Sequence, residues 1–368
     1  MARDNLLSKI INKTLSKYLS LPENKNLLLG NPKKFLIVRQ HNQLGDLLAG
    51  VSLFRAIKET FPGSHITLIV SPFNYPGLIK NKFIDKLFVF DKNKIFNPTY
   101  FKTFRNLIRF EYDVVIVPVV VSISFTSNLI AGFTNAKIKI GPASLDGKNN
   151  SSAYFFDRRV DIDWRKHPDS NVSERSLDIV RPFGITTKNY KSEITFDKSD
   201  KSNAEYFISG LKNDDEILVG LHVGAGKVPN RWSLIKFAKL ITKINQSYNA
   251  KFYVTGSSSD LEEIKFLKKK LDFEIGEFIN QSIPVVAALI SKSDLFISND
   301  TGIMHVAGTT DTPQISIFGP TNPLNWAPIG ENKYFIRKSD LIDDVSVEDV
   351  YRKVKNILTV NTKETKIG

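Results

Sequence analysis

Residues 294–308 read DLFISNDTGIMHVAG, and this stretch decides the fold. Residues 295–298 predict a short strand, residues 299–302 predict a polar turn, and the residues that follow have the apolar spacing of a helix. A second apolar run at 314–318 follows this helix and predicts another strand. Strand, helix and strand in this order indicate a parallel α/β unit, whose ligands lie at the carboxyl ends of the strands.

The polar turn is a candidate anion site. The side chain of Asp300 or Thr301 can cap the helix by accepting a hydrogen bond from one of its free N–H groups. The remaining N–H groups near Gly302 would face outward at the positive end of the helix, where an anion is favoured. His305 follows by one turn, on the side that can face the same anion. The alternative interpretation is a capped helix start with a solvated histidine.

Composition places the chain among globular proteins of two domains. It has 368 residues, of which 42% are apolar and 24% are charged. We find neither a run long enough for a membrane-spanning helix nor a secretory pattern. The lack of cysteine excludes disulfides and thiolate metal sites and fits a cytoplasmic location. We also see no acidic metal-binding cluster, and we expect no cofactor.

The positive charge is concentrated in the first part of the chain. Residues 1–150 contain 21 Lys and Arg against 9 Asp and Glu, whereas residues 151–368 contain 30 against 29. Almost all of the net charge of +13 therefore lies in the first 150 residues. A basic surface attracts an anionic membrane or an acidic substrate. Nucleic acid is not an expected partner, because we find no nucleic-acid-binding motif.

The sequence predicts three segments. Residues 1–33 form a basic amphipathic extension and linker, in which Lys9, Lys13 and Lys17 recur on one side of a predicted helix and apolar residues on another. This helix can pack on the domain or lie on a membrane surface. Residues 34–190 and 191–368 each alternate strands with helices, which indicates two Rossmann-like, doubly wound α/β domains. The expected strands are 34–39, 65–70, 86–90, 113–121, 217–223, 251–255, 295–298 and 314–318, and the expected helices include 173–183, 233–244, 284–291 and 344–358.

Two loops can carry chemistry. Gly224 and Ala225 begin a loop that follows a strand and also contains Lys227 and Arg231, a combination that suits a diphosphate. This loop matches neither a Walker motif nor a dinucleotide fingerprint. In the first half, Asp46 occupies the equivalent turn between strand and helix. It is either a helix cap or a general base.

Further motifs reveal a family resemblance. They comprise FLIVR at 35–39 with Gly45 and Asp46, FP at 61–62, GLHVGA at 220–225 with RW at 231–232, NDTG at 299–302 with MH at 304–305, and FGPT at 318–321 with Pro328. Together they make residues 34–358 resemble glycosyltransferase family 9, the bacterial lipopolysaccharide heptosyltransferases.

The resemblance implies two domains that face a cleft, the GT-B fold, with the acceptor on the N-terminal domain and the nucleotide sugar on the C-terminal domain. It implies an inverting, metal-independent transfer from ADP-heptose to an anionic, lipid-linked core sugar, by an enzyme at the cytoplasmic face of the inner membrane. Asp46 matches the catalytic carboxylate. The implied acceptor-binding residues are Arg39, Gln43 and Gly45, and the implied donor-binding residues are Gly224, Ala225, Lys227, Arg231, Asp260, Glu262, Asp300, Thr301, Gly302 and His305.

Two departures from the family pattern leave the donor sugar and the acceptor open. The basic extension is not part of the pattern, and residues 71–76 lack the arginines expected for an inner-core acceptor. The alternatives are a transferase that uses another nucleotide sugar and acceptor, a sugar-nucleotide epimerase, and a non-catalytic nucleotide-sugar-binding protein. An assay of donor consumption with and without acceptor separates them.

Overall fold

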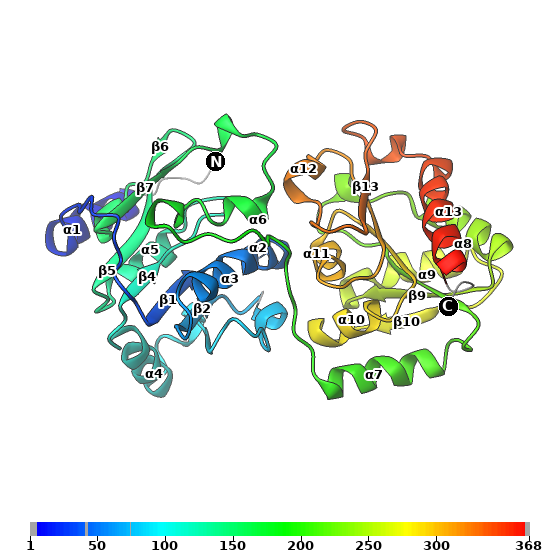
Figure 1. Ribbon diagram of the computed structural model, residues 1–368, viewed down its shortest axis with the longest axis horizontal. Helices are drawn as coiled ribbons and strands as arrows, with labels where there is room; N and C mark the ends of the chain where they lie inside the picture. Colours follow the sequence, from blue (N-terminus) through cyan, green and yellow to red (C-terminus); the bar gives the residue numbers. More distant parts are fainter. Residues whose placement is uncertain (1–5, 41–42, 74, 365–368) are drawn as a thin grey trace. The chain divides into compact units, whose positions relative to one another are not determined.

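The computed structural model describes residues 6–40, 43–73 and 75–364 (Figure 1). Contacts between α-carbons divide the chain into two compact units, Met1–Tyr190 (unit 1) and Lys191–Gly368 (unit 2). Each unit contains its own sheet, so the predicted α/β fold with two Rossmann-like domains is confirmed. Residues 1–5 and 365–368, which the predicted segments include, lie outside the described residues.

The sheet of unit 1 has the strand order β3-β2-β1-β4-β5-β6, with β7 also paired to β5. β6 runs antiparallel to β5, and the other pairings are parallel. Because the central strands are covered on both faces, their sequences are almost continuously apolar. The strands are β1 (Lys34–Arg39), β2 (His65–Val70), β3 (Lys86–Val89), β4 (Val114–Ile116), β5 (Ile138–Leu145), β6 (Lys148–Asn149) and β7 (Arg158–Ile162).

Helices cover both faces of this sheet. α4 (Pro98–Ile108) and α5 (Phe125–Gly132) bury apolar side chains against Leu36 and Val38 of β1. α2 (Leu44–Ala49), α3 (Val51–Thr60) and α6 (Val172–Arg175) pack against one another on the opposite face. The short 3₁₀ turns of this unit are η1 (Tyr75–Leu78), η2 (Lys92–Lys94), η3 (Ala153–Phe155), η4 (Trp164–Lys166) and η5 (Arg181–Phe183).

The predicted N-terminal helix is present as α1 (Leu6–Leu19), and it contacts η3. The side-chain amide of Asn12 donates to the backbone oxygen of Ser151 at 3.2 Å, and its oxygen accepts a hydrogen bond from the Tyr154 hydroxyl at 2.6 Å. Tyr18, which the sequence places on the apolar side of the helix, is 76% exposed. The helix is therefore attached to unit 1 through a polar side chain.

The sheet of unit 2 is entirely parallel within the described residues and has the order β10-β9-β8-β11-β12-β13. The direction of the connections reverses between β8 and β11, which makes this pair the topological switch point where ligands of such sheets bind. The strands are β8 (Ile217–His222), β9 (Ala250–Gly256), β10 (Gly276–Ile279), β11 (Leu295–Asn299), β12 (Gln314–Ile317) and β13 (Lys333–Ile336).

Two groups of helices cover this second sheet (Figure 1). α8 (Leu234–Ser247), α9 (Leu261–Lys268) and α13 (Val347–Glu364) share one core, in which Trp232 and Phe237 are fully buried. α7 (Lys198–Ser209), α10 (Ile283–Ile290) and α11 (Gly302–Gly308) form the other group, and α12 (Pro323–Trp326) is a single turn. The unit also contains the 3₁₀ turns η6 (Val228–Asn230), η7 (Ser258–Asp260) and η8 (Ile342–Asp344).

Three predicted elements differ from the structure. The strand expected at 113–121 is only β4. The helix expected at 173–183 is α6 followed by turns, because the backbone hydrogen bonds tighten after Ser176, where the Leu177 and Asp178 nitrogens donate to carbonyls three residues back. The helix expected after residue 46 begins earlier, at Leu44, and is interrupted at Gly50. No helix in the part of the chain that the structure describes is both long enough and apolar enough to cross a membrane.

The centre of β8 should not tolerate a side chain at Gly220. A Cβ there would lie 2.3 Å from the Tyr253 hydroxyl oxygen and 2.7 Å from a ring carbon of Phe296. We expect Gly220→Ala to lower the free energy of unfolding by about 2 kcal/mol, the usual scale for overpacking. Urea denaturation measures this change, with Gly210→Ala as the control, because its Cβ would meet nothing closer than 3.7 Å. Equal losses in the two variants would contradict the prediction.

Candidate active site

The candidate donor site lies at the carboxyl ends of β8 and β11 in unit 2. Residues 223–232 connect β8 to α8, and residues 300–301 connect β11 to α11. Because β8 and β11 are neighbours in a parallel sheet, both connections leave the sheet at the same edge. The structure therefore brings the two predicted donor motifs together.

Asn299 holds these connections in register. Its side chain is fully buried, and its amide nitrogen donates to the backbone oxygens of Val223 at 2.8 Å and Gly224 at 3.3 Å. Its amide oxygen accepts a hydrogen bond from the backbone nitrogen of Trp232 at 3.1 Å. One side chain thus fixes both ends of the 223–232 loop, and it satisfies backbone groups that would otherwise be buried without partners.

Asp300 is held in the turn and does not cap α11. Its carboxylate accepts a hydrogen bond from the Asn230 amide at 2.8 Å. Thr301 occupies the N-cap position with extended backbone angles, but its side chain makes no capping hydrogen bond. The predicted capping is therefore wrong. Burial raises the pKa of Asp300, while a hydrogen bond from Thr321 and the charge of Lys227 oppose that rise.

His305 faces a largely apolar environment. It is buried, and its ring packs edge-on against Trp326 with 6.3 Å between the ring centroids. Burial lowers the pKa of His305 to about 4, so the imidazole is neutral near pH 7. Such a ring can hydrogen-bond to a ligand but adds no positive charge to an anion site.

Two cations lie in the 223–232 loop. The Arg231 guanidinium donates to the backbone oxygen of Ala225 at 2.8 Å and forms an ion pair with Glu263 of α9, also at 2.8 Å. Lys227 is exposed, and its charge acts on the carboxylate of Asp300. The loop therefore presents one exposed ammonium group and one guanidinium whose charge is already shared with a carboxylate.

Asp260 and Glu262, the two candidate carboxylates after β9, lie in different surroundings. Asp260 packs against Gly224, where its Oδ1 atom lies only 2.3 Å from the position that a Cβ at residue 224 would take. The side chain of Glu262 is 85% exposed and pairs with Lys265 at 2.9 Å. The structure thus brings Asp260 to the loop but leaves Glu262 on the outer surface.

The candidate catalytic carboxylate lies in unit 1, at the carboxyl end of β1. Asp46 is the third residue of α2 and is buried, as is Gly45, whereas Gln43 is exposed just before the helix. The Arg39 guanidinium lies beneath α2 and donates to the backbone oxygen of Asp46 at 2.5 Å. Gly50, which follows α2, lies next to this guanidinium, since a Cβ there would be in van der Waals contact with its Nη1 atom at 3.6 Å.

Arg39 also sets the electrostatics of this site. Its side chain is 1% exposed, and burial lowers the pKa of Arg39 to about 10, although the charge of Asp46 acts in the opposite direction. The guanidinium is therefore still protonated near pH 7. The candidate base therefore has a buried positive charge beside it, which also binds its backbone.

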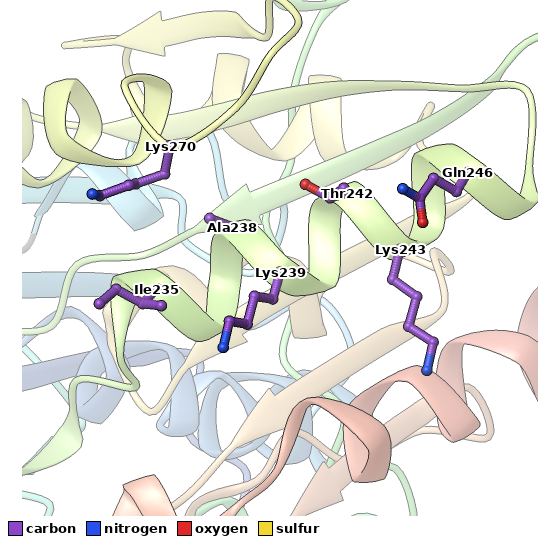
Figure 2. A pocket seen from close by; sticks show the side chains of 7 residues that line it. All are labelled: Ile235, Ala238, Lys239, Thr242, Lys243, Gln246 and Lys270. Atoms are coloured by element: carbon purple, nitrogen blue, oxygen red, sulfur yellow. The ribbon is translucent and has the colours of Figure 1, made fainter.

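Two of the surface hollows among the described residues differ in their lining. One has a volume of about 590 Å³ and lies in unit 1 around α6, the helix that packs against α2 and α3. Its lining is mostly charged: Asp163, Trp164, Lys166, His167, Pro168, Asp169, Ser170, Glu174, Arg175, Asp178 and Arg181. The other, of about 470 Å³, runs along α8 (Figure 2) and includes no predicted site residue.

Sequence reasoning missed three residues that shape the donor site. Asn299 was assigned only to the turn, and Asn230 and Glu263 were not singled out. A polar residue at the end of an apolar strand was a usable signal for Asn299, because buried amides generally bridge backbone groups. The pairing of Glu263 with Arg231 joins residues 32 positions apart and has no local signature.

Comparisons with known proteins show the family to which the chain is similar. Residues 100–354 match the family model described as glycosyltransferase family 9 (heptosyltransferase). Lipopolysaccharide heptosyltransferase 3 of Escherichia coli K12 is 23% identical over 299 residues, which cover 78% of this chain and 83% of the relative. Lipopolysaccharide core heptosyltransferase OpsX of Haemophilus influenzae is also 23% identical over 299 residues, which cover 81% of this chain and 82% of OpsX.

Solved structures share the fold. A family 9 glycosyl transferase from Veillonella parvula has a TM-score of 0.77 at 19% identity, covering 93% of this chain and 99% of its own. E. coli ADP-heptose lps heptosyltransferase II has a TM-score of 0.73 at 17% identity, covering 89% and 99%.

The Asn299 network predicts a large local effect on stability. We expect Asn299→Ala to lower the free energy of unfolding by about 3 kcal/mol, because it leaves buried backbone groups without partners. Urea denaturation measures the change, and Asn213→Ala, at an exposed position, is the control. A loss no greater than that of the control would show that the loop does not depend on Asn299.

Proposed function

The chain belongs to glycosyltransferase family 9, and we propose that it transfers a heptose from ADP-heptose to a sugar of a lipopolysaccharide core or a similar anionic glycan. It is a glycosyltransferase by family. Two observations support the substrates: the relatives bear the names of lipopolysaccharide heptosyltransferases, and one structural neighbour is named for ADP-heptose. The observation that carries the proposal is the network at Asn299, which places a glycine loop, two cations and the half-buried carboxylate of Asp300 at one switch point.

The donor binds to unit 2 in this proposal. Lys227 and Arg231 hold the diphosphate, and the backbone of Gly224, Ala225, Thr301 and Gly302 lies close to it, since glycine permits close approach. Asp260 lies beside the loop and accepts hydrogen bonds from ribose hydroxyls. Asp300 and His305 complete the site by hydrogen bonding, because the imidazole carries no charge near pH 7. The exposed Glu262 has no role in this arrangement.

The acceptor binds to unit 1. Asp46 removes the proton from the acceptor hydroxyl, and the resulting oxygen attacks the anomeric carbon of the sugar while the bond to the diphosphate breaks. The electron pair leaves with ADP, whose charge is stabilised by Lys227 and Arg231, and the configuration at the anomeric carbon inverts. These two cations do the work that a metal ion does elsewhere, so the transfer is metal-independent.

The remaining acceptor residues act in different ways. Arg39 is a positioning residue, because it is buried and binds the backbone of Asp46. Gln43 and Gly45 lie where an acceptor would approach Asp46. The charged hollow around α6 offers a second region for the glycan, since its acidic and basic side chains can hydrogen-bond to sugar hydroxyls and anionic groups.

We place the enzyme in the cytoplasm, in peripheral contact with the inner membrane. The excess positive charge of the first 150 residues supports this location, because a lipid-linked acceptor is delivered at an anionic surface.

The activity is tested by measuring consumption of ADP-heptose with and without a lipopolysaccharide core acceptor. Release of ADP that depends on the acceptor, together with a heptosylated product, supports the proposal. A product formed from the donor alone indicates an epimerase. Binding of ADP-heptose without turnover in either condition indicates a binding protein.

Asp46→Asn should lower turnover by about 100-fold, the usual scale for a general base, because the amide cannot accept the proton. The affinity for ADP, measured by calorimetry, should be unchanged, since the donor binds to the other unit. Asp215→Asn, at an exposed position of unit 2, is the control and should keep full activity. Full turnover by folded Asp46→Asn protein would refute the role.

Arg231→Ala should weaken binding of ADP by about tenfold and binding of AMP by less, because a charged partner of the outer phosphate is lost. Glu263→Gln is the reciprocal variant. It removes the carboxylate that shares the guanidinium, so it should preserve or strengthen ADP binding. Calorimetry with both nucleotides measures these effects, and equal losses for ADP and AMP in Arg231→Ala would place the guanidinium away from the diphosphate.

A further inference from the structure

A surface of unit 1 that the proposed site does not use is rich in basic side chains, and it lies between Asp91, which caps η2, and Glu111. Residues 92–110 contain five basic side chains and neither Asp nor Glu. This segment comprises η2 and α4, and Lys92, Lys94, Lys102, Arg105 and Arg109 are all exposed. Solvated helix faces usually mix both signs of charge, so a segment without acidic residues favours an anionic partner.

The same segment also exposes aromatic side chains. Phe96 is 93% exposed and Phe101 is 47% exposed, and both lie among the basic residues. An exposed phenylalanine keeps apolar area in contact with water, and burying that area in a partner is favourable. Basic and aromatic residues on one short helical segment are the combination by which proteins bind the interfacial region of a membrane.

The surface is rigidly presented. The Asn97 side chain caps α4 by accepting from the Tyr100 backbone nitrogen at 3.0 Å, and the Tyr100 hydroxyl donates to the Val89 backbone oxygen at 3.0 Å. On the inner face of the helix, Phe104 packs against Phe90 with 4.7 Å between ring centroids. The core thus uses the inner face of α4, and Phe101, Lys102 and Arg105 remain exposed.

The position of this surface fits delivery of a lipid-linked substrate. β1, β2 and β3 are parallel neighbours, so their carboxyl ends share one edge of the sheet. Asp46 follows β1 at this edge, and η2 with Phe96 follows β3 at the same edge. A bilayer that contacts η2 and the start of α4 would therefore lie on the edge of unit 1 that carries the candidate base.

We propose that Lys92, Lys94, Phe96, Phe101, Lys102 and Arg105, together the α4 surface, dock unit 1 on an anionic membrane. The inference rests on the proposed function, which supplies the reason for contact with a lipid-linked acceptor. The lysines and arginine attract anionic headgroups, and the two phenylalanines enter the interface between headgroups and acyl chains. A nucleic acid would bind the basic side chains but would offer no apolar phase in which to bury Phe96 and Phe101, whereas a membrane offers both.

Co-sedimentation of the full-length protein with vesicles tests the proposal, without donor or acceptor present. Vesicles of phosphatidylcholine and phosphatidylglycerol should bind the protein, vesicles of phosphatidylcholine alone should bind it much less, and added salt should weaken the binding by screening. Phe96→Ser/Phe101→Ser and Lys102→Glu/Arg105→Glu should each lower the partition coefficient by about tenfold.

Matched variants in unit 2 control for charge and for exposed aromatic area. Lys239→Glu/Lys270→Glu changes the net charge by the same amount, and both lysines line the hollow along α8 (Figure 2). Tyr206→Ser/Phe266→Ser removes side chains that are 84% and 40% exposed. Both controls should bind vesicles as the unchanged protein does. Losses equal to those of the α4 variants would overturn the assignment of the surface.

Two further outcomes would also overturn it. Retained vesicle binding by both α4 variants would place the contact elsewhere, and binding of a DNA oligonucleotide but not of vesicles would show a polyanion site. Urea denaturation followed by circular dichroism confirms that each variant is folded, whether or not it binds a nucleotide. The result is independent of catalysis, because a protein that binds vesicles through the α4 surface but does not consume ADP-heptose would refute the proposed function and leave the docking surface intact.

Discussion

The buried amide of Asn299 is the constraint on which the candidate donor site in unit 2 depends. The fold dictates that two chain segments leave the sheet at the switch point between β8 and β11, but a parallel sheet alone does not fix the path of either one. Asn299 fixes both, because its one side chain can donate to carbonyl groups before the glycine loop and accept from an N–H group after it. The positions of Lys227, Arg231 and Asp300 follow from that arrangement.

A similar dependence holds in unit 1, where Arg39 takes the place of the buried amide. Burying a guanidinium costs free energy, because the charge loses its hydration. Arg39 is nevertheless buried beneath α2, where it binds the backbone oxygen of Asp46, the candidate base. The place of Asp46 in α2 therefore depends on one buried contact, between the Arg39 guanidinium and the backbone oxygen of Asp46.

The sequence allowed the architecture to be predicted because apolar runs and turn residues alternate with clear periods. β1 and β2 were predicted with their observed bounds, since each is a short, almost wholly apolar run between polar residues. The predicted ends of elements were wrong where tertiary packing overrides local preference, as at the start of α2 at Leu44. They were also wrong where the apolar run that begins with β4 continues as irregular chain. In the candidate site, the motif residues could be predicted from their local sequence pattern. Glu263 and Asn230, which bind Arg231 and Asp300, could not be predicted, because a contact between distant segments has no signature in the local sequence.

The ion pair between Arg231 and Glu263 has a consequence for the end of the proposed catalytic cycle. A guanidinium that faced the site alone would have to be rehydrated when a nucleotide leaves, and this would slow departure. Glu263 lies within 2.8 Å and offers a replacement partner at that moment. In the proposed donor site the Glu263 carboxylate therefore lowers the barrier to release of ADP. The same ion pair lowers the affinity of the free enzyme for the nucleotide.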